Sequence, residues 1–374
     1  MRFHDLSFQG YMDRANMASD DESRIDLLMQ AALIAEDRGE HENAAMARMR
    51  VVESSHNSDT CFETLTAFAY AIHSEHVQSM WMINWCYKWM FNRLMDIAAI
   101  PLSTIEGVFD AFRSHYKKAS LGTSAEKQLL LEYAIDTGRL DEAPARYEAW
   151  KEDAKTAGAD CEACRLDTSA QFELAMRNLK QARKVAMPIL MGNKSCASVP
   201  HCTFARFVLP MLEDGDLDAA KDMYLRGYSL VSTTRGYLDH ASSHTLFLGL
   251  TGNWSRALTA AGTRMYWTRT TRNDRHRFWS MLAIETAFAR ALQDGERVVP
   301  ISCRMPDEVY EEDGLYDTKR VGSWFRDQVD DIAQQFDHRN GTSMYSDSAA
   351  RVRAMLEHRY CVDLDSESVS DEDD

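Results

Sequence analysis

Four cysteines and a histidine occupy two short segments of the sequence. Cys161 and Cys164 form a CxxC pair, Cys196 follows 32 residues after Cys164, and His201 and Cys202 lie just beyond it. A tetrahedral zinc ion requires four thiolate or imidazole ligands. These segments can supply three thiolates, with His201 or Cys202 as the fourth ligand. They predict one structural zinc whose four coordination positions are all filled by the protein, which would hold two loops together.

The same spacing fits two other interpretations. Small thiols are often buried or placed in turns without binding a metal. A CxxC pair can also be redox-active, but no thioredoxin-like strand–helix context surrounds this one. Structural zinc and ordinary thiols therefore both stand as interpretations of Cys161, Cys164 and Cys196.

A second segment, RMYWTRTTRNDRHRFW, alternates cationic and aromatic side chains. Guanidinium groups beside aromatic rings suit carboxylates or phosphates, and such surfaces also stack on RNA bases. The alternative is a helix pair with its aromatics inward and its arginines solvated. We take the segment as a candidate partner-binding surface, comprising Arg264, Arg269, Arg272, Arg275, Arg277 and Trp267.

Familiar catalytic motifs are absent from the sequence. It contains no P-loop, GxGxxG, HExxH or GxSxG pattern. His240 and His244 stand four residues apart beside Asp239, so one helix face would present both imidazoles, but no third metal ligand is visible. Acidic runs such as EEDG are expected in an acidic chain and usually belong to solvated faces. We therefore expect a protein that is not an enzyme.

Charge and hydropathy limit the location and the classes of partner. The 374 residues include 42 basic and 58 acidic ones, for a net charge of −16. Seven of the acids lie between Asp363 and Asp374, which leaves −9 for the remainder. A negative body disfavours nonspecific binding to nucleic acid or anionic membrane. No signal-peptide pattern and no apolar run of membrane-spanning length occurs, so the eight cysteines predict a cytoplasmic protein.

Helices must position these candidate residues, and a repeated turn signal locates the helices. A small or polar turn residue is followed by a bulky residue two positions on and by alanine five positions on. Four copies begin at Gly138, Arg177, Gly215 and Gly252, spaced 39, 38 and 37 residues apart, and end at Ala143, Ala182, Ala220 and Ala257. An earlier copy pairs Gly39 with Ala44.

Apolar stripes at helical spacing flank each turn, as in QLLLEYAIDT before Gly138 and DAAKDMYLRGY after Gly215. They predict antiparallel helix pairs in which the turn residue ends the first helix and alanine lets the backbones approach. One pair cannot bury both faces, so successive pairs are expected to stack into a solenoid. In this register the two cysteine loops share one edge, roughly 10 Å apart.

This pattern resembles the tetratricopeptide repeat, whose turn and alanine core appear in the four copies. Further segments are similar to a group of bacterial tetratricopeptide proteins of unassigned function: WCYKWMFNRL from Trp85, DCEACRLD from Asp160, CASVPH from Cys196 and FDHRNGTSMYS from Phe336. The resemblance covers most of residues 25–350 and implies an all-α, tetratricopeptide-like solenoid of stacked antiparallel helix pairs. It implies no activity, because the group has no established one.

The chain is expected to comprise an N-terminal extension (1–24), tetratricopeptide-like helical repeats (25–300), a C-terminal helical cap (301–360) and an acidic disordered tail (361–374). Trp81, Trp85 and Trp89 repeat every four residues and predict an aromatic seam between helix pairs, with a ligand platform as the alternative. The tail could dock on the arginine segment, serve as a partner-binding arm, or keep the protein soluble.

Together these features favour a protein–protein interaction module that takes a protein or peptide partner, including an acidic one, in its solenoid groove. The alternative is a small-ligand or signalling-peptide sensor, as in bacterial regulators that resemble this fold. Those regulators commonly carry an N-terminal helix-turn-helix domain, for which residues 1–24 are too short. An enzyme with an unusual site is the third class, and nucleic acid and membrane are not expected partners.

Overall fold

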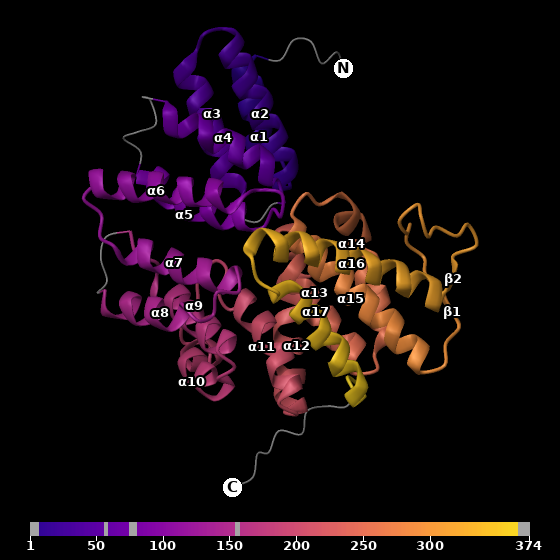
Figure 1. Ribbon diagram of the computed structural model, residues 1–374. Coiled ribbons are helices and arrows are strands. Elements are labelled where there is room, and N and C mark those ends of the chain that lie inside the picture. The colour runs from indigo at the N-terminus through magenta and orange to yellow at the C-terminus, as the bar shows by residue number, and fades with distance from the viewer. Residues whose placement is uncertain (1–6, 56–58, 75–80, 154–157, 366–374) are drawn as a thin grey trace. The chain divides into compact units, whose positions relative to one another are not determined.

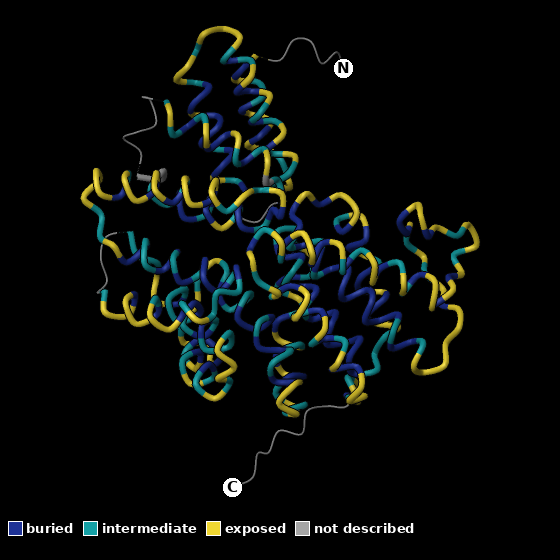
Figure 2. The backbone as a smooth tube through the Cα atoms, viewed as in Figure 1, coloured by how far each residue is buried: buried dark blue, intermediate teal, exposed yellow. Residues whose placement is uncertain are grey.

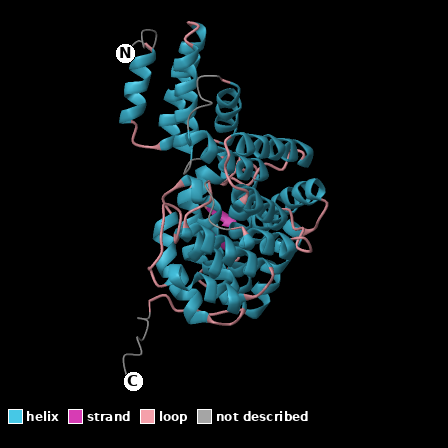
Figure 3. Ribbon diagram, turned by 90° about the vertical axis from the view of Figure 1, so that its left-hand side faces the viewer, coloured by secondary structure: helices cyan, strands magenta, loops and turns pink. Residues whose placement is uncertain are grey.

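Helices dominate the computed structural model, which describes residues 7–55, 59–74, 81–153 and 158–365 (Figure 1). Two short strands, β1 (Val298–Pro300) and β2 (Leu315–Asp317), form an antiparallel hairpin within these ranges (Figure 3). The all-α prediction is therefore confirmed. In the same part of the chain, no helix has the length and apolar character needed to cross a membrane.

The chain divides into two units, and the boundary falls within α7 (Ser124–Asp136) and α8 (Ala143–Glu152). Unit 1 comprises residues 1–130, 149–159 and 234–236, and unit 2 comprises residues 131–148, 160–233 and 237–374. The helices of unit 1 are α1 (Phe8–Met17), α2 (Asp21–Asp37), α3 (His41–Ser54), α4 (Cys61–His73), α5 (Trp81–Met95) and α6 (Leu102–Lys118). Those of unit 2 are α9 (Glu162–Ala175), α10 (Leu179–Leu190), α11 (His201–Glu213), α12 (Leu217–Val231), α13 (Leu238–Leu250), α14 (Trp254–Thr270), α15 (Asp274–Gln293), α16 (Thr318–Asn340) and α17 (Met344–Met355).

The repeated turn signal falls between consecutive helices, as its spacing predicts. Its turn residues all have positive φ: Gly39 (+72°), Gly138 (+75°), Arg177 (+57°), Gly215 (+84°) and Gly252 (+83°). A left-handed residue after the last helical turn allows the chain to reverse. The alanines five positions on, Ala44, Ala143, Ala182, Ala220 and Ala257, are all 0% exposed. Packed helix pairs are thereby confirmed for α2–α3, α9–α10, α11–α12 and α13–α14.

Aromatic rings of α5 and α6 contribute to the core of unit 1. The centroids of Phe91 and Phe109 lie 5.5 Å apart, and both side chains are buried. Trp85 and Trp89 are half-buried and meet edge to face at 6.1 Å. The side chain of Trp81 lies outside the described residues, so the three-indole seam stays a prediction.

The centre of unit 2 is formed by α13 and α15, which Figure 2 colours as buried along most of their length. Phe288 on α15 stacks on Phe325 of α16, with centroids 6.2 Å apart. After α16 the chain turns into α17, and Tyr345 stacks on Phe336 at 4.1 Å. Helix pairing therefore continues beyond the four copies that the sequence signal marks.

The start of α17 lies against the turn that follows α7. Thr342 donates a hydrogen bond to the carbonyl of Thr137 at 2.7 Å. A Cβ on Gly138 would come within 2.7 Å of the Met344 Cβ, so this turn requires glycine for space as well as for its φ. Helices that are distant in sequence thus meet within unit 2.

The described part of the acidic C-terminus, up to Asp365, packs along α12 and the start of α14. The carbonyl of Val362 accepts from Asn253 at 3.0 Å, and the carbonyl of Asp363 accepts from Lys221 at 2.7 Å. Arg256 pairs with Asp365 at 2.8 Å. These contacts differ from docking on the arginine segment, which was one of the three alternatives for the tail, and residues 366–374 lie outside the described ranges.

Candidate metal centre and polar pocket

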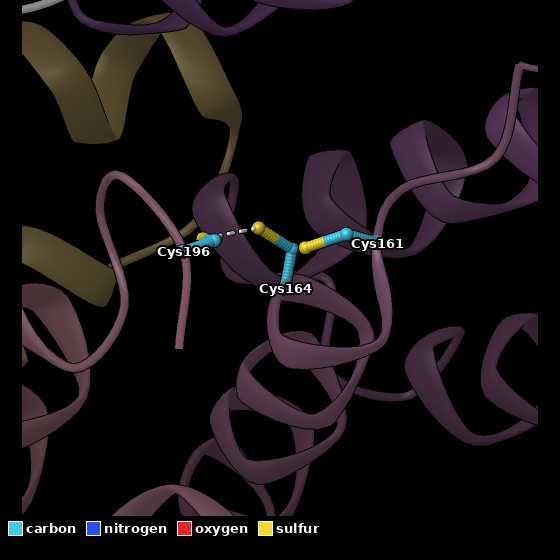
Figure 4. Close-up of side chains that lie close together, drawn as sticks. All are labelled: Cys161, Cys164 and Cys196. Atoms are coloured by element: carbon cyan, nitrogen blue, oxygen red, sulfur yellow. Dashed lines mark hydrogen bonds between the residues drawn. The ribbon is translucent and has the colours of Figure 1, made fainter. Parts of the chain in front are cut away.

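Three cysteines from two separate loops meet at the start of α9. Cys161 is the residue that precedes the helix, Cys164 lies in its first turn, and Cys196 follows α10. Their sulfur atoms all lie within 4.8 Å of one another, and Cys164 Sγ is 3.2 Å from Cys196 Sγ (Figure 4). The three thiols could hold a metal ion. We call this group the cysteine cluster.

Local structure explains why the cysteine cluster forms. The amide of Cys196 donates to the carbonyl of Val199 at 2.9 Å, which closes a turn just before α11. Val199 is buried against Ala163 and Ile189, and Cys164 and Cys196 pack against this small apolar group. The apolar contact therefore holds the Cys196 turn against the first turn of α9.

The two close thiols have opposite electrostatic environments. Burial opposes ionisation of Cys196, yet the amide of Ser198, the thiol of Cys164 and the amide of Val199 hydrogen-bond to its sulfur and lower its pKa. Burial and the neighbouring Cys196 sulfur raise the pKa of Cys164. Ionisation is therefore easier at Cys196 than at Cys164.

The two residues predicted as a fourth zinc ligand lie in other surroundings. The ring of His201 stacks on Tyr237, with centroids 5.7 Å apart. Cys202 packs against Val231, Tyr237 and Ala241. Neither belongs to the group of ligand atoms within 4.8 Å, so the described structure assembles three of the four expected ligands.

The six residues of the predicted arginine surface occupy different environments. Arg264 is only 3% exposed and donates to Thr245 Oγ1 at 2.9 Å and to Tyr228 at 3.3 Å. Arg269 and Arg272 are exposed, and Trp267 is half-buried. Arg269 lies 3.5 Å from Asp307, and Arg277 pairs with Asp274. Arg264 thus serves the core of unit 2, which leaves the other members as candidates for a surface.

Arg275 lines a pocket of about 290 Å³ in unit 2. Its titratable lining also includes Asp136, Arg206, Asp239, His240 and Arg351. The apolar lining includes Leu174, Leu209, Pro210, Trp279, Val352 and Met355. These residues come from α7, α9, α11, α13, α15 and α17. We call this site the polar pocket.

Asp239 and His240 form a close ion pair in the polar pocket. His240 Nδ1 lies 2.6 Å from the Asp239 carboxylate, with His276 at 3.6 Å and Arg275 at 3.9 Å. Burial opposes ionisation of both groups. The neighbouring His240, His276 and Arg275 nevertheless hold the Asp239 pKa well below its usual value, and Asp239 with Cys202 raises the His240 pKa to about 10.

Other charges of the polar pocket also have partners within unit 2. Arg275 Nη1 lies 3.3 Å from Asp136. Arg206 pairs with Asp167, which also accepts from Thr203 at 2.6 Å. The fixed charges and the apolar wall between them suit recognition of a ligand.

Arg351 on α17 completes this pattern. Its Nε donates to Glu213 at 2.8 Å, so a carboxylate behind the wall neutralises a guanidinium that lines the pocket. Sequence reasoning missed the pocket because six helices contribute to it, and only Asp239, His240 and Arg275 had attracted notice.

The second histidine of the i, i+4 pair has a structural role. His244 is fully buried, and burial with nearby His240 and Arg264 lowers its pKa to about 3, so the ring is neutral. It meets Tyr224 edge to face at 6.0 Å. A Cβ on Gly227 would come within 2.7 Å of the imidazole, so α12 carries glycine where it passes this ring.

No family model matches the chain, and a search of curated proteins finds no similar sequence.

Proposed function

We propose that this chain is a binding protein of tetratricopeptide-like helix pairs that holds a short acidic segment of a protein partner in the polar pocket. The observation that carries the proposal is the pocket itself. The pocket, of about 290 Å³, combines fixed charges with an apolar wall and has room for a few side chains of a larger partner. We also place the chain in the cytoplasm, on its cysteine content alone.

The guanidinium groups of the lining support an acidic partner, whose carboxylate would share them with the internal carboxylates that they already contact. Three arginines and a protonated His240 face two aspartates, although the whole chain carries −16. Arginine pairs with carboxylates through two parallel hydrogen bonds, and Trp279 with Leu209 offers apolar surface beside it. A segment with one carboxylate next to an apolar side chain would use both features.

Binding to defined peptides tests the proposal. We would measure fluorescence polarisation of a random peptide library sorted by charge, with the full chain and with Arg275→Gln. Acidic–apolar peptides should bind the wild type, and the variant should lose about tenfold in affinity, which corresponds to about 1.4 kcal/mol. The control Arg304→Gln changes an exposed arginine outside the pocket lining and should bind like the wild type.

A small-ligand sensor is the second candidate, favoured by the same mixture of fixed charges and apolar side chains in the lining. Native mass spectrometry of the purified chain distinguishes the two. A copurifying small molecule that Arg275→Gln loses, with no selectivity among peptides, would replace the peptide proposal. Equal binding of acidic and basic peptides would also contradict it.

A further inference from the structure

We propose that Cys161, Cys164 and Cys196 form a three-thiolate site for a thiophilic d10 ion, Zn²⁺ or Cu⁺, in which a tetrahedral Zn²⁺ would keep one coordination position for an external ligand. This differs from the closed four-ligand zinc that the sequence predicts. It is independent of the peptide proposal, since it concerns a different set of residues.

The donor set selects the class of ion. The described group contains sulfur atoms alone, all within 4.8 Å of one another, and no carboxylate or imidazole joins it at that distance. Thiolates favour Zn²⁺ and Cu⁺ over Mg²⁺, Ca²⁺ or Mn²⁺. Cys161 and Cys164 also stand at the start of α9, where the helix dipole favours negative sulfur atoms.

The number of thiols favours an ion over a disulfide. A disulfide would use two sulfurs and leave the third without a role, whereas an ion engages all three. Figure 4 shows the sulfur atoms of Cys161 and Cys164 on the side that faces Cys196, so the three side chains converge from two loops. The apolar group of Ala163, Ile189 and Val199 fixes these loops before any ion binds.

The open position follows from where the other candidate ligands lie. The ring of His201 stacks on Tyr237, and Cys202 packs against Tyr237 and Ala241. Cys161 is exposed, so solvent reaches the cluster from its side. A zinc ion with three protein ligands keeps its fourth place for water or another ligand, as catalytic and exchangeable sites do.

The ion would act on the polar pocket through the chain. Cys161 and Cys164 begin α9, which carries the pocket residue Leu174, and the Cys196 turn leads into α11, which carries Arg206 and Leu209. Drawing the three sulfurs onto one ion therefore fixes two walls of the pocket relative to each other. Any such coupling to peptide binding rests on the proposed function, whereas ion binding itself does not.

Metal analysis of the full-length reduced chain tests the site. After dialysis against Zn²⁺ or Cu⁺, elemental mass spectrometry should find one ion of either kind per chain. Co²⁺ in place of Zn²⁺ should give a sulfur-to-cobalt absorption band, and added imidazole should shift the cobalt spectrum because it enters the open position. Dialysis against a mixture of Zn²⁺ and Cu⁺ then shows which of the two ions the site prefers.

Serine variants assign the ligands. Cys161→Ser, Cys164→Ser and Cys196→Ser should each weaken ion binding by more than about tenfold, the usual cost of losing even an outer-sphere partner. Cys202→Ser and the half-buried Cys303→Ser are matched controls and should bind like the wild type. Cys161 is exposed, so its variant keeps the fold, which circular dichroism checks.

Three outcomes would overturn the proposal. One is undiminished binding in the cluster variants. Another is loss of the ion in Cys202→Ser or His201→Gln, which would restore the closed four-ligand site. The third is a reduced chain that takes up neither ion and forms a Cys164–Cys196 disulfide under mild oxidant. None of these outcomes depends on whether acidic peptides bind.

Discussion

The cysteine cluster and the polar pocket draw on the same helices, α9 and α11, but they compensate charge differently. In the pocket each charge has a partner supplied by the fold: Arg206 with Asp167, Arg351 with Glu213, and His240 with Asp239. The cluster gathers three sulfur donors, and hydrogen bonds to the Cys196 sulfur lower its pKa, but no cation of the fold pairs with it among the contacts described. A site neutralised from within is stable when empty, whereas a cluster of donors gains most from an ion that comes from outside.

The largest expected effect is on the cysteine cluster, where a bound ion should stabilise the folded chain. Zn²⁺ that binds the folded chain only should add about 2.7 kcal/mol to the free energy of unfolding at one hundred times its Kd. Thermal unfolding with and without Zn²⁺ measures the shift in Tm. The chain with Cys164→Ser should show no shift, and an equal shift there would place the stabilising ion elsewhere.

Removing an internal partner from the pocket should have the next largest effect. Arg206→Met removes the guanidinium that pairs with the buried Asp167 carboxylate and keeps the hydrogen bond from Thr203, at a cost of about 2 kcal/mol. Urea unfolding measures the loss. Arg304→Met, in an exposed pair with Asp307, should change stability by less than about 0.5 kcal/mol. Similar values for the two variants would mean that the pocket charges are not held by the fold.

The third expected effect is a dependence of stability on pH, which arises from His240 in the polar pocket. The His240 pKa rises from an ordinary value near 6.5 to about 10, so its contribution is complete below about pH 6.5 and is lost as the pH rises through about 10. The groups around His240 include Asp239, Cys202, His201, His244 and the ring of Tyr237.

His240→Gln should therefore cost about 1.5 kcal/mol near pH 6 and almost nothing near pH 10. Urea unfolding at pH 6, 8 and 10 gives this profile. The exposed His338→Gln serves as the control and should match the wild type throughout. A cost for His240→Gln that does not change with pH would contradict an internally charged pair.

The smallest expected effect concerns two turns, one after α9 and one after α11. Arg177 has φ +57° after α9, whereas Gly215 has φ +84° after α11. Arg177→Gly should stabilise by about 1 kcal/mol, because a side chain is strained in this conformation. Gly215→Ala should destabilise by a similar amount, and no atom lies within 4 Å of the added Cβ, so the cost is conformational alone. Thermal unfolding that moves both variants in the same direction would contradict this reasoning.

The helix pairs could be predicted because local rules specify them. Turn residues at Gly138, Arg177 and Gly215 and their buried alanines depend on φ and on close backbone approach, and both leave marks at fixed spacing. The pair formed by α16 and α17 carries the same left-handed glycine, Gly341, but lacks the alanine spacing, so the signal did not extend to it.

The sites were only partly predictable. The repeat register placed Cys161, Cys164 and Cys196 on one edge, and the structure brings their sulfurs together. It could not tell that His201 would stack on Tyr237, because that contact depends on how α11 meets the residue before α13. Arg264 likewise looked like a surface residue by type, but it is buried and donates a hydrogen bond to Thr245 on a neighbouring helix.

By itself, then, the sequence determined the helices, their turns and the loops that carry the thiols, since hydrophobic period and backbone conformation are local properties. Only the tertiary structure decided which side chains became partners. The polar pocket exists because six helices place Asp136, Arg206, Asp239, Arg275 and Arg351 around one space. Ion pairs and cavities depend on distances between residues far apart in the chain, and those distances are set by how whole helices pack.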